Sequence, residues 1–132
     1  MRVFIDTSAF LAVLDADDKN HPKAKRRWEE LISSENILIS HNYILVETFA
    51  LVQNRLGMAA IKVFNDDILP VVSVEWVSDS THKTAVSSLI TASRRKLSLV
   101  DCVSFETMRQ LGIETAFAFD SHFAEQSFRL IP

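Results

Sequence analysis

The sequence contains very little cysteine, glycine or proline. Its 132 residues include one cysteine, two glycines and three prolines. A single cysteine, Cys102, excludes an internal disulfide and any metal site built from several cysteines. So few glycines and prolines argue against long loops and low-complexity linkers. We therefore expect regular elements joined by short turns, in one domain that spans residues 1–132.

Long hydrophobic runs and a positive charge balance are also lacking. No apolar run approaches the roughly 20 residues that a membrane-spanning helix needs, and no signal-peptide cleavage site follows the first residues. Together with the single cysteine, this predicts a soluble, cytoplasmic protein. The formal net charge is −3, whereas non-enzymatic nucleic-acid binders are typically basic overall. Any contact with RNA must therefore come from a local basic patch.

The chain does contain an alternation of short apolar runs with helical patterns. Strands are expected at residues 2–5, 37–39, 70–74, 115–119 and 128–131, and helices at residues 9–14, 21–34, 43–56, 58–68, 79–96 and 99–111. Thr7 or Ser8, Asn42 and Ser98 are expected to cap three of these helices. Strands that alternate with helices predict an α/β fold, with a mostly parallel sheet covered on both faces.

Two of the expected strands are each followed by an aspartate. Asp6 follows the apolar run 3–5, and Asp120 follows the run 117–119. In open α/β sheets, ligands bind beyond the carboxyl ends of the strands. If these two strands are neighbours, their ends lie roughly 5 Å apart. Two carboxylates at that separation repel each other, and a divalent cation relieves the repulsion.

Two further acids lie within apolar helical stripes. Glu47 shares a helical row with Ile44 and Leu51, and Asp101 shares one with Phe105. A carboxylate on such a stripe needs a partner, because a buried unpaired charge is costly. Hard oxygen ligands of this kind suit Mg²⁺ or Mn²⁺ rather than zinc. The four acids together therefore predict one metal-binding pocket.

Each acid taken singly also has a structural explanation. Asp6 and Asp120 fit turn residues or helix caps, and Glu47 fits a helix edge with its carboxylate in solvent. Asp101 completes a capping box with Ser98, a role that is compatible with metal binding. The functional interpretation depends on the whole set.

The same residues resemble the acidic motifs of PIN domains, in their order and spacing. The matching segments are Phe4-Ile-Asp6-Thr7-Ser8-Ala-Phe, Val46-Glu47-Thr48, Leu97-Ser-Leu-Val-Asp101-Cys-Val-Ser-Phe and Phe119-Asp120-Ser-His122-Phe123. The resemblance covers nearly the whole chain, and the chain length fits the toxin branch usually called VapC. It implies a three-layer α/β/α sandwich with a central parallel sheet.

The resemblance also implies a function and partners. Toxins of this kind are Mg²⁺- or Mn²⁺-dependent endoribonucleases that typically form homodimers and are silenced by a cognate antitoxin, as a type II toxin–antitoxin pair. In this family, acids matching Asp6, Glu47, Asp101 and Asp120 hold the metal, and a hydroxyl matching Thr7 or Ser8 assists. Some relatives carry a further acid or Asn soon after the fourth position. This chain has Ser121 to Ala124 there, before Glu125, which leaves the ligands of a second metal open.

Two basic clusters are candidates for holding RNA. Lys23, Lys25, Arg26 and Arg27 form the first, which is better explained as a solvated helix face. Arg94, Arg95 and Lys96 form the second, which precedes Asp101 by only a few residues and is expected to bind phosphates. His122, close to Asp120, is also expected to contact a phosphate. Leu56, Met58 and Val63 are candidates for a dimer face.

Other classes of protein with acids at strand ends fit the sequence less well. A haloacid-dehalogenase-type phosphatase needs a second aspartate two residues after the first, where this chain has Ser8. A receiver domain needs a phosphoacceptor aspartate after a central strand, but the expected strand 37–39 is followed by Ser40. The remaining alternative is a non-catalytic PIN-like module that binds metal or RNA without cleaving it.

Overall fold

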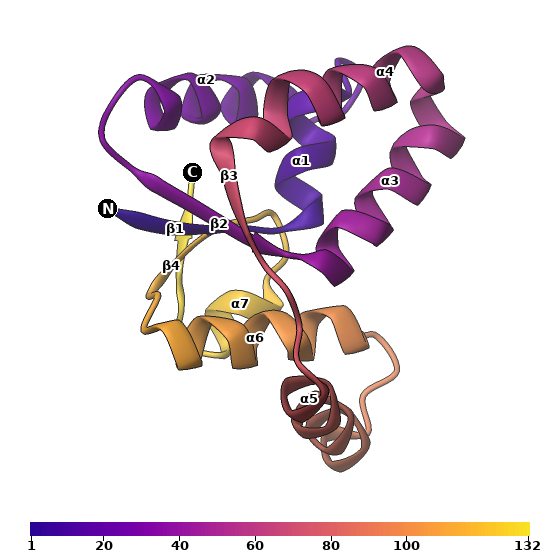
Figure 1. The fold of residues 1–132 in the computed structure, drawn as a ribbon, viewed down its shortest axis with the longest axis vertical. Coiled ribbons are helices and arrows are strands. Elements are labelled where there is room, and N and C mark those ends of the chain that lie inside the picture. Colours follow the sequence, from indigo (N-terminus) through magenta and orange to yellow (C-terminus); the bar gives the residue numbers. More distant parts are fainter.

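A central sheet, with helices on both of its faces, organises the molecule (Figure 1). The computed structural model describes all residues, 1–132. The sheet has five strands in the order β3-β2-β1-β4-β5, and every pairing is parallel. The strands are β1 (Arg2–Ile5), β2 (Ile37–His41), β3 (Val72–Glu75), β4 (Thr115–Phe117) and β5 (Arg129–Ile131). This confirms the predicted α/β fold with a parallel sheet.

Seven α-helices form the two outer layers. They are α1 (Thr7–Leu14), α2 (His21–Ile32), α3 (Asn42–Leu56), α4 (Met58–Val63), α5 (Asp79–Ala92), α6 (Leu99–Leu111) and α7 (His122–Glu125). Helices α1 to α4 lie on one face of the sheet, and α6 and α7 lie on the other (Figure 1). Helix α5 packs on the outside of α6. No helix combines the length and the apolar character needed to cross a membrane.

The central strands are apolar because both faces of the sheet are covered. Val3, Phe4 and Ile5 of β1 have no exposed surface, as expected for a parallel strand between two helical layers. Phe10 and Phe64 fill the core in one layer, and their rings meet edge to face with centroids 5.2 Å apart. Parallel pairing matters for function because it brings the carboxyl ends of neighbouring strands to one side of the sheet.

Two helix caps differ from the prediction. Asp6, not Thr7 or Ser8, caps α1: its backbone is extended and its side chain accepts a hydrogen bond from Ser8 N. His41, not Asn42, caps α3, because its ring Nδ1 accepts from Ile44 N at 3.2 Å. Helix α1 therefore begins directly at the strand end, which holds Asp6 rigidly.

His41 also links two helices through its second ring nitrogen. Since Nδ1 accepts from Ile44 N, the proton lies on Nε2, which donates to Ser104 Oγ at 2.8 Å. Ser104 Oγ in turn donates to Val100 O on α6. The ring is fully buried, and burial lowers the pKa of His41 from 6.5 to about 3. A neutral histidine thus connects the start of α3 to the first turns of α6.

Several predicted boundaries were wrong for local reasons. The helix predicted for residues 79–96 ends at Ala92, because Ser93 adopts a left-handed conformation with φ of 50°. The strand predicted for residues 70–74 begins at Val72, because Leu69–Val71 forms a 3₁₀ turn that contains Pro70. The helix predicted for residues 58–68 changes at Phe64 into a π-helical turn.

Smaller differences affect single side chains and strand ends. Strand β4 ends at Phe117 rather than residue 119, and β5 begins one residue later than predicted. Strand β2 is two residues longer than predicted, ending at His41. Ile32, at the end of α2, has 49% of its surface exposed, although Trp28 one turn earlier is buried.

Candidate metal centre

Neighbouring strand ends bring the first and last of the predicted acids to the same edge of the sheet. Strands β1 and β4 pair in parallel with Ile5 opposite Phe117. Asp6 follows β1 directly, and its backbone N–H donates to Phe117 O at 3.1 Å. Asp120 follows β4 three residues later. The condition on which the sequence argument depended, that these two strands are neighbours, therefore holds.

Ser8 fixes the Asp6 carboxylate. Asp6 is 5% exposed, and its Oδ2 accepts from Ser8 N at 3.1 Å and from Ser8 Oγ at 2.6 Å. The same hydroxyl oxygen accepts from Phe119 N at 2.9 Å. Ser8 thus ties the start of α1 to the segment that leads to Asp120. It acts on the site by orienting Asp6.

Asp101 lies in the first turn of α6, where it completes a capping box. Its backbone N–H donates to Ser98 Oγ at 3.0 Å, and its Oδ2 accepts from Ser98 N at 3.2 Å. The residue is 7% exposed. The predicted capping box is confirmed, and it holds the carboxylate at the positive end of a helix dipole.

Asp101, Asp120 and His122 form a compact group that we call the ligand cluster. One ligand atom from each of the three lies within 4.8 Å of the others. His122 Nδ1 is 2.9 Å from Asp120 Oδ1 and 3.5 Å from Asp101 Oδ2. Nevertheless, Nδ1 is buried and has no hydrogen-bond partner.

Burial and mutual repulsion make the site electrostatically unfavourable when it is empty of cations. The pKa of Asp6 is raised to about 7, chiefly by burial, against the opposing hydrogen bonds from Ser8 and with smaller contributions from the negative charges of Asp101 and Asp120. The pKa of Asp101 is also raised, first by burial and then by Asp120, against the opposing effects of Ser98 and His122. Asp6 therefore lies within electrostatic reach of both other aspartates. A divalent cation would offset all three charges at once.

The donor set fits a hard divalent cation. Carboxylate oxygens with one imidazole nitrogen are compatible with Mg²⁺ and more so with Mn²⁺, while zinc sites usually use sulfur or several histidines. His122 Nδ1 is buried and has no hydrogen-bond partner, as expected for an atom that binds a cation. The ligand cluster can hold such an ion, and Asp6, which lies outside the cluster, adds a buried carboxylate within electrostatic reach of it.

Glu47 lies near the site but outside the ligand cluster. It is half-buried on α3 and lines a shallow hollow with Val46 and Val100, the residue before Asp101. Its neighbour Thr48 donates to Thr7 Oγ1 at 3.1 Å, next to Asp6. Helix α3 is thus anchored to the start of α1. The Glu47 carboxylate is not within the group of ligand atoms.

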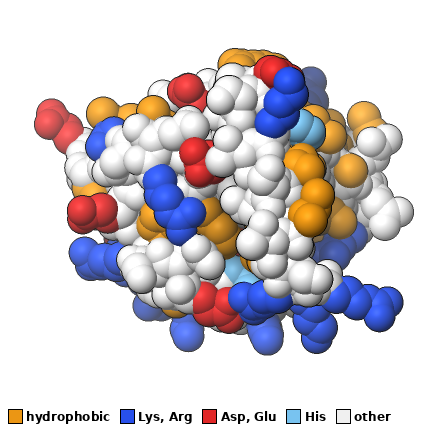
Figure 2. All heavy atoms as spheres, turned by 90° about the horizontal axis from the view of Figure 1, so that it is seen from below, with side chains coloured by type: hydrophobic (Ala, Val, Ile, Leu, Met, Phe, Trp, Pro, Cys, Tyr) orange, Lys and Arg blue, Asp and Glu red, His pale blue; other side chains and the backbone are white.

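The three residues of the second basic cluster differ in their contacts. Arg94 pairs with Glu125 of α7, with Nη1 2.8 Å from Oε2 and Nη2 3.5 Å from Oε1. Arg95 and Lys96 are exposed and take part in no ion pair. Viewed from the side of α5, the basic side chains gather mainly along one margin of the molecule (Figure 2).

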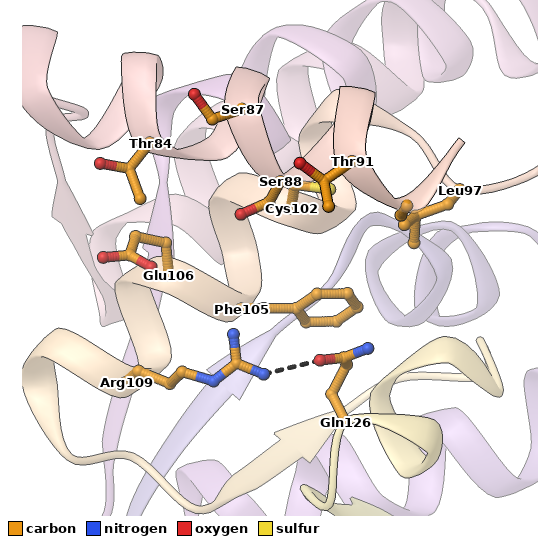
Figure 3. A pocket seen from close by; sticks show the side chains of 11 residues that line it. Thr84, Ser87, Ser88, Thr91, Leu97, Cys102, Phe105, Glu106, Arg109 and Gln126 are labelled. Atoms are coloured by element: carbon orange, nitrogen blue, oxygen red, sulfur yellow. Dashed lines mark hydrogen bonds between the residues drawn. The ribbon is translucent and has the colours of Figure 1, made fainter. Parts of the chain in front are cut away.

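A separate cavity of about 460 Å³ lies between α5 and α6 (Figure 3). Hydroxyl groups from α5, among them Thr84, Ser88 and Thr91, line one wall. Arg109 closes another side by donating to Gln126 Oε1 at 2.7 Å. None of the four predicted acids lines this cavity, so it is distinct from the candidate metal centre.

The sequence did not predict that the His122 ring would lie next to Asp101 and Asp120. His122 was expected to contact an RNA phosphate, whereas the structure places its ring between Asp101 and Asp120. The spacing Asp120-x-His122 was the only available signal. It was weak because an i, i+2 pair converges only when the backbone turns, as it does here where His122 N donates to Asp120 Oδ1 at 2.9 Å.

Comparison with known proteins identifies one family. The model of the PIN domain family matches residues 3–129. The chain is 35% identical over 127 residues to the 23S rRNA-specific endonuclease VapC20 of Mycobacterium tuberculosis, covering 96% of this chain and 95% of that protein.

Solved structures show the same fold. The crystal structure of M. tuberculosis VapC20, described as a Sarcin-Ricin loop cleaving toxin, superposes with a TM-score of 0.86 at 35% identity, covering 98% of this chain and 99% of that one. VapBC2 from Rickettsia felis, bound to a DNA fragment from its promoter, gives a TM-score of 0.72 at 12% identity, covering 98% and 97%. FitAcB from Neisseria gonorrhoeae gives 0.70 at 14% identity, covering 98% and 96%.

Proposed function

The chain belongs to the PIN domain family, and from that premise we propose that it is a metal-dependent endoribonuclease, the toxin of a type II toxin–antitoxin pair. The observation that carries the proposal is that Asp101, Asp120 and His122 each bring a ligand atom within 4.8 Å of the others, within electrostatic reach of the buried Asp6. The 35% identity with a 23S rRNA-specific endonuclease supports ribosomal RNA as the substrate class. The enzyme would act in the cytoplasm, where that RNA is found.

Asp6, Asp101, Asp120 and Glu47 are the proposed catalytic acids, and they would hold Mg²⁺ or Mn²⁺. When bound, such an ion supplies Lewis-acid chemistry: it lowers the pKa of water and offsets negative charge on the phosphate. Asp6 is the most rigid of the four, because the strand end and Ser8 both fix it. Glu47 would join the site by a change of side-chain conformation from its half-buried position on α3.

The hydroxyls and basic residues have supporting roles in this proposal. Ser8 orients Asp6 through its hydrogen bond, and Thr7 connects the start of α1 to α3. Arg95 and Lys96 are exposed and available to bind RNA phosphates. Arg94, also predicted to bind RNA, is paired with Glu125 and would have to leave that partner to do so.

An antitoxin and a second copy of the chain are the proposed protein partners. The likeness in fold to toxins solved within VapBC and FitAB assemblies supports an antitoxin. Of the predicted dimer face, Met58 and Val63 have 64% and 44% of their surface exposed, and Leu56 is partly buried. Exposed large apolar side chains on neighbouring turns are consistent with an interface between copies.

Cleavage of 23S rRNA tests the proposed function. Purified protein is incubated with ribosomes in Mg²⁺, Mn²⁺ or EDTA, and the RNA ends are mapped by primer extension. We expect a discrete cut in either metal, none in EDTA and none with Asp6→Asn. Metal binding without any cut, in ribosomal or total RNA, would instead favour the non-catalytic module.

A further inference from the structure

We infer that His122 is a direct nitrogen ligand of the bound cation, which gives the site a preference for Mn²⁺ over Mg²⁺. This inference rests on the proposed function, because it concerns the metal of the same site. It gives the residue a role different from the phosphate contact predicted from the sequence. It also supplies a ligand after the fourth acid, where this chain has no further carboxylate or Asn before Glu125.

The environment of the ring nitrogen favours a bound cation. His122 Nδ1 is the one buried side-chain nitrogen or oxygen that lacks a hydrogen-bond partner. Buried polar atoms are nearly always satisfied, and those that are not require an explanation. Here the unpaired nitrogen lies within 3.5 Å of an oxygen from each of two aspartates. A cation shared by the nitrogen and both carboxylates would satisfy all three groups.

The spacing of the potential ligand atoms also fits a bound cation. Adjacent ligands of an octahedral ion with bonds of about 2.0–2.1 Å are separated by roughly 2.9 Å. His122 Nδ1 and Asp120 Oδ1 are 2.9 Å apart, although they form no hydrogen bond. The separation therefore matches one edge of such a coordination sphere.

Contacts at both ends of α7 fix the segment that carries His122. The backbone N–H of His122 donates to Asp120 Oδ1, so that the turn itself directs the side chain towards the carboxylates. At the other end of α7, Glu125 pairs with Arg94. The turn and the short helix that carry His122 are therefore fixed next to Asp120.

The predicted metal preference follows from the type of ligand. Imidazole nitrogen suits transition metals, while Mg²⁺ prefers carboxylate, carbonyl and water oxygens. Replacing one oxygen by nitrogen should therefore strengthen Mn²⁺ binding relative to Mg²⁺ binding. An Asn at this position would offer an oxygen at a similar distance from the backbone and would weaken that preference.

Pulsed electron paramagnetic resonance of the Mn²⁺-loaded protein tests the assignment. A directly bound imidazole couples its ¹⁴N nucleus to the Mn²⁺ electron spin, and we expect this coupling in the wild type and not in His122→Ala or His122→Asn. In titrations of free Mn²⁺, His122→Ala should bind at least about tenfold more weakly. His122→Asn should show a smaller ratio of Mg²⁺ to Mn²⁺ dissociation constants.

The matched control is His82→Asn, because His82 bonds to Tyr43 rather than to any aspartate. It should keep the ¹⁴N coupling and the wild-type affinities, and circular dichroism checks that every variant is folded. Wild-type protein that binds Mn²⁺ without ¹⁴N coupling, or coupling that survives in His122→Ala, would overturn the inference. Ribosomal RNA cleavage is scored separately, so a coupled but inactive protein contradicts only the proposed function.

Discussion

At the scale of single residues, the Asp6 carboxylate serves the proposed activity but lowers the stability of the metal-free protein. This carboxylate is buried, follows a strand directly and is repelled by two other aspartates. Such an arrangement costs stability in the absence of metal and is retained where function requires it. The sequence singled out four acids because each follows or interrupts an apolar segment, and the structure brings Asp101 and Asp120 together and leaves Glu47 outside their cluster. Ser8 and His122 were also candidates from the sequence, but their contacts with Asp6 and Asp120 were not predictable, because hydrogen-bond and ring geometry leave no pattern in the sequence.

Asp6→Asn should therefore abolish RNA cleavage and stabilise the metal-free protein. Removing the buried charge relieves both desolvation and repulsion, and one unit of pKa shift corresponds to about 1.4 kcal/mol. We expect the free energy of unfolding in EDTA at pH 8 to rise by roughly 1–4 kcal/mol. Denaturant titration measures this change. The exposed Asp17→Asn is the control and should leave activity and stability unchanged; an Asp6→Asn protein that is less stable than the wild type would contradict the account.

His41 should make stability depend on pH. Its pKa is about 3 in the folded protein and 6.5 when exposed, so the unfolded chain binds a proton more readily. The stability due to the neutral ring is present above pH 6.5 and is lost as pH falls from 6.5 towards 3, by at most about 1.4 kcal/mol per pH unit.

Comparing the wild type with His41→Gln isolates this contribution. Unfolding is measured by denaturant at several pH values between 7 and 4. We expect His41→Gln to be less stable at pH 7, because two buried hydrogen bonds are altered, and to lose less stability on acidification. Parallel pH profiles for the two proteins would show that His41 is not buried as a neutral ring.

At the scale of elements, the loop between α5 and α6 brings basic residues close to the site. Its length was underestimated from the sequence, because residues 93–96 include no glycine or proline to mark the end of the helix, whereas Ser93 turns the chain. The pairing of Arg94 with Glu125 was also not predictable, since the two residues are distant in sequence and meet only in the folded structure. This pairing leaves Arg95 and Lys96 as the exposed positive charges of the loop.

Charge reversal of Arg95 and Lys96 should weaken RNA binding and reduce its dependence on salt. Each lost phosphate contact lowers the slope of log affinity against log salt by about 0.7–0.9, so the double variant should lose about 1–2 units of slope. Fluorescence anisotropy with inactive Asp6→Asn protein and labelled RNA measures this. Arg94→Gln is the control, because Arg94 is already paired, and it should change the slope little. Equal slopes for the wild type and the double variant would exclude this loop from the RNA interface.

At the scale of the whole molecule, the order of elements determines where the acids meet. The parallel sheet and its two helical layers followed from the alternation of short apolar runs and amphipathic segments. Strand order did not follow from that alternation, but the two strands that end before aspartates proved to be neighbours. The path of the chain then adds Asp101 from the start of α6 and leaves Glu47 at the edge of the site.

The central claim is that residues far apart in the sequence form one pocket for a divalent cation. Anomalous diffraction from a crystal soaked in Mn²⁺ locates the ion directly. We predict a peak bonded to Asp101, Asp120 and His122, with Asp6 in contact either directly or through one water. A well-ordered Mn²⁺ elsewhere on the protein, with these side chains left unbound at saturating metal, would contradict the account.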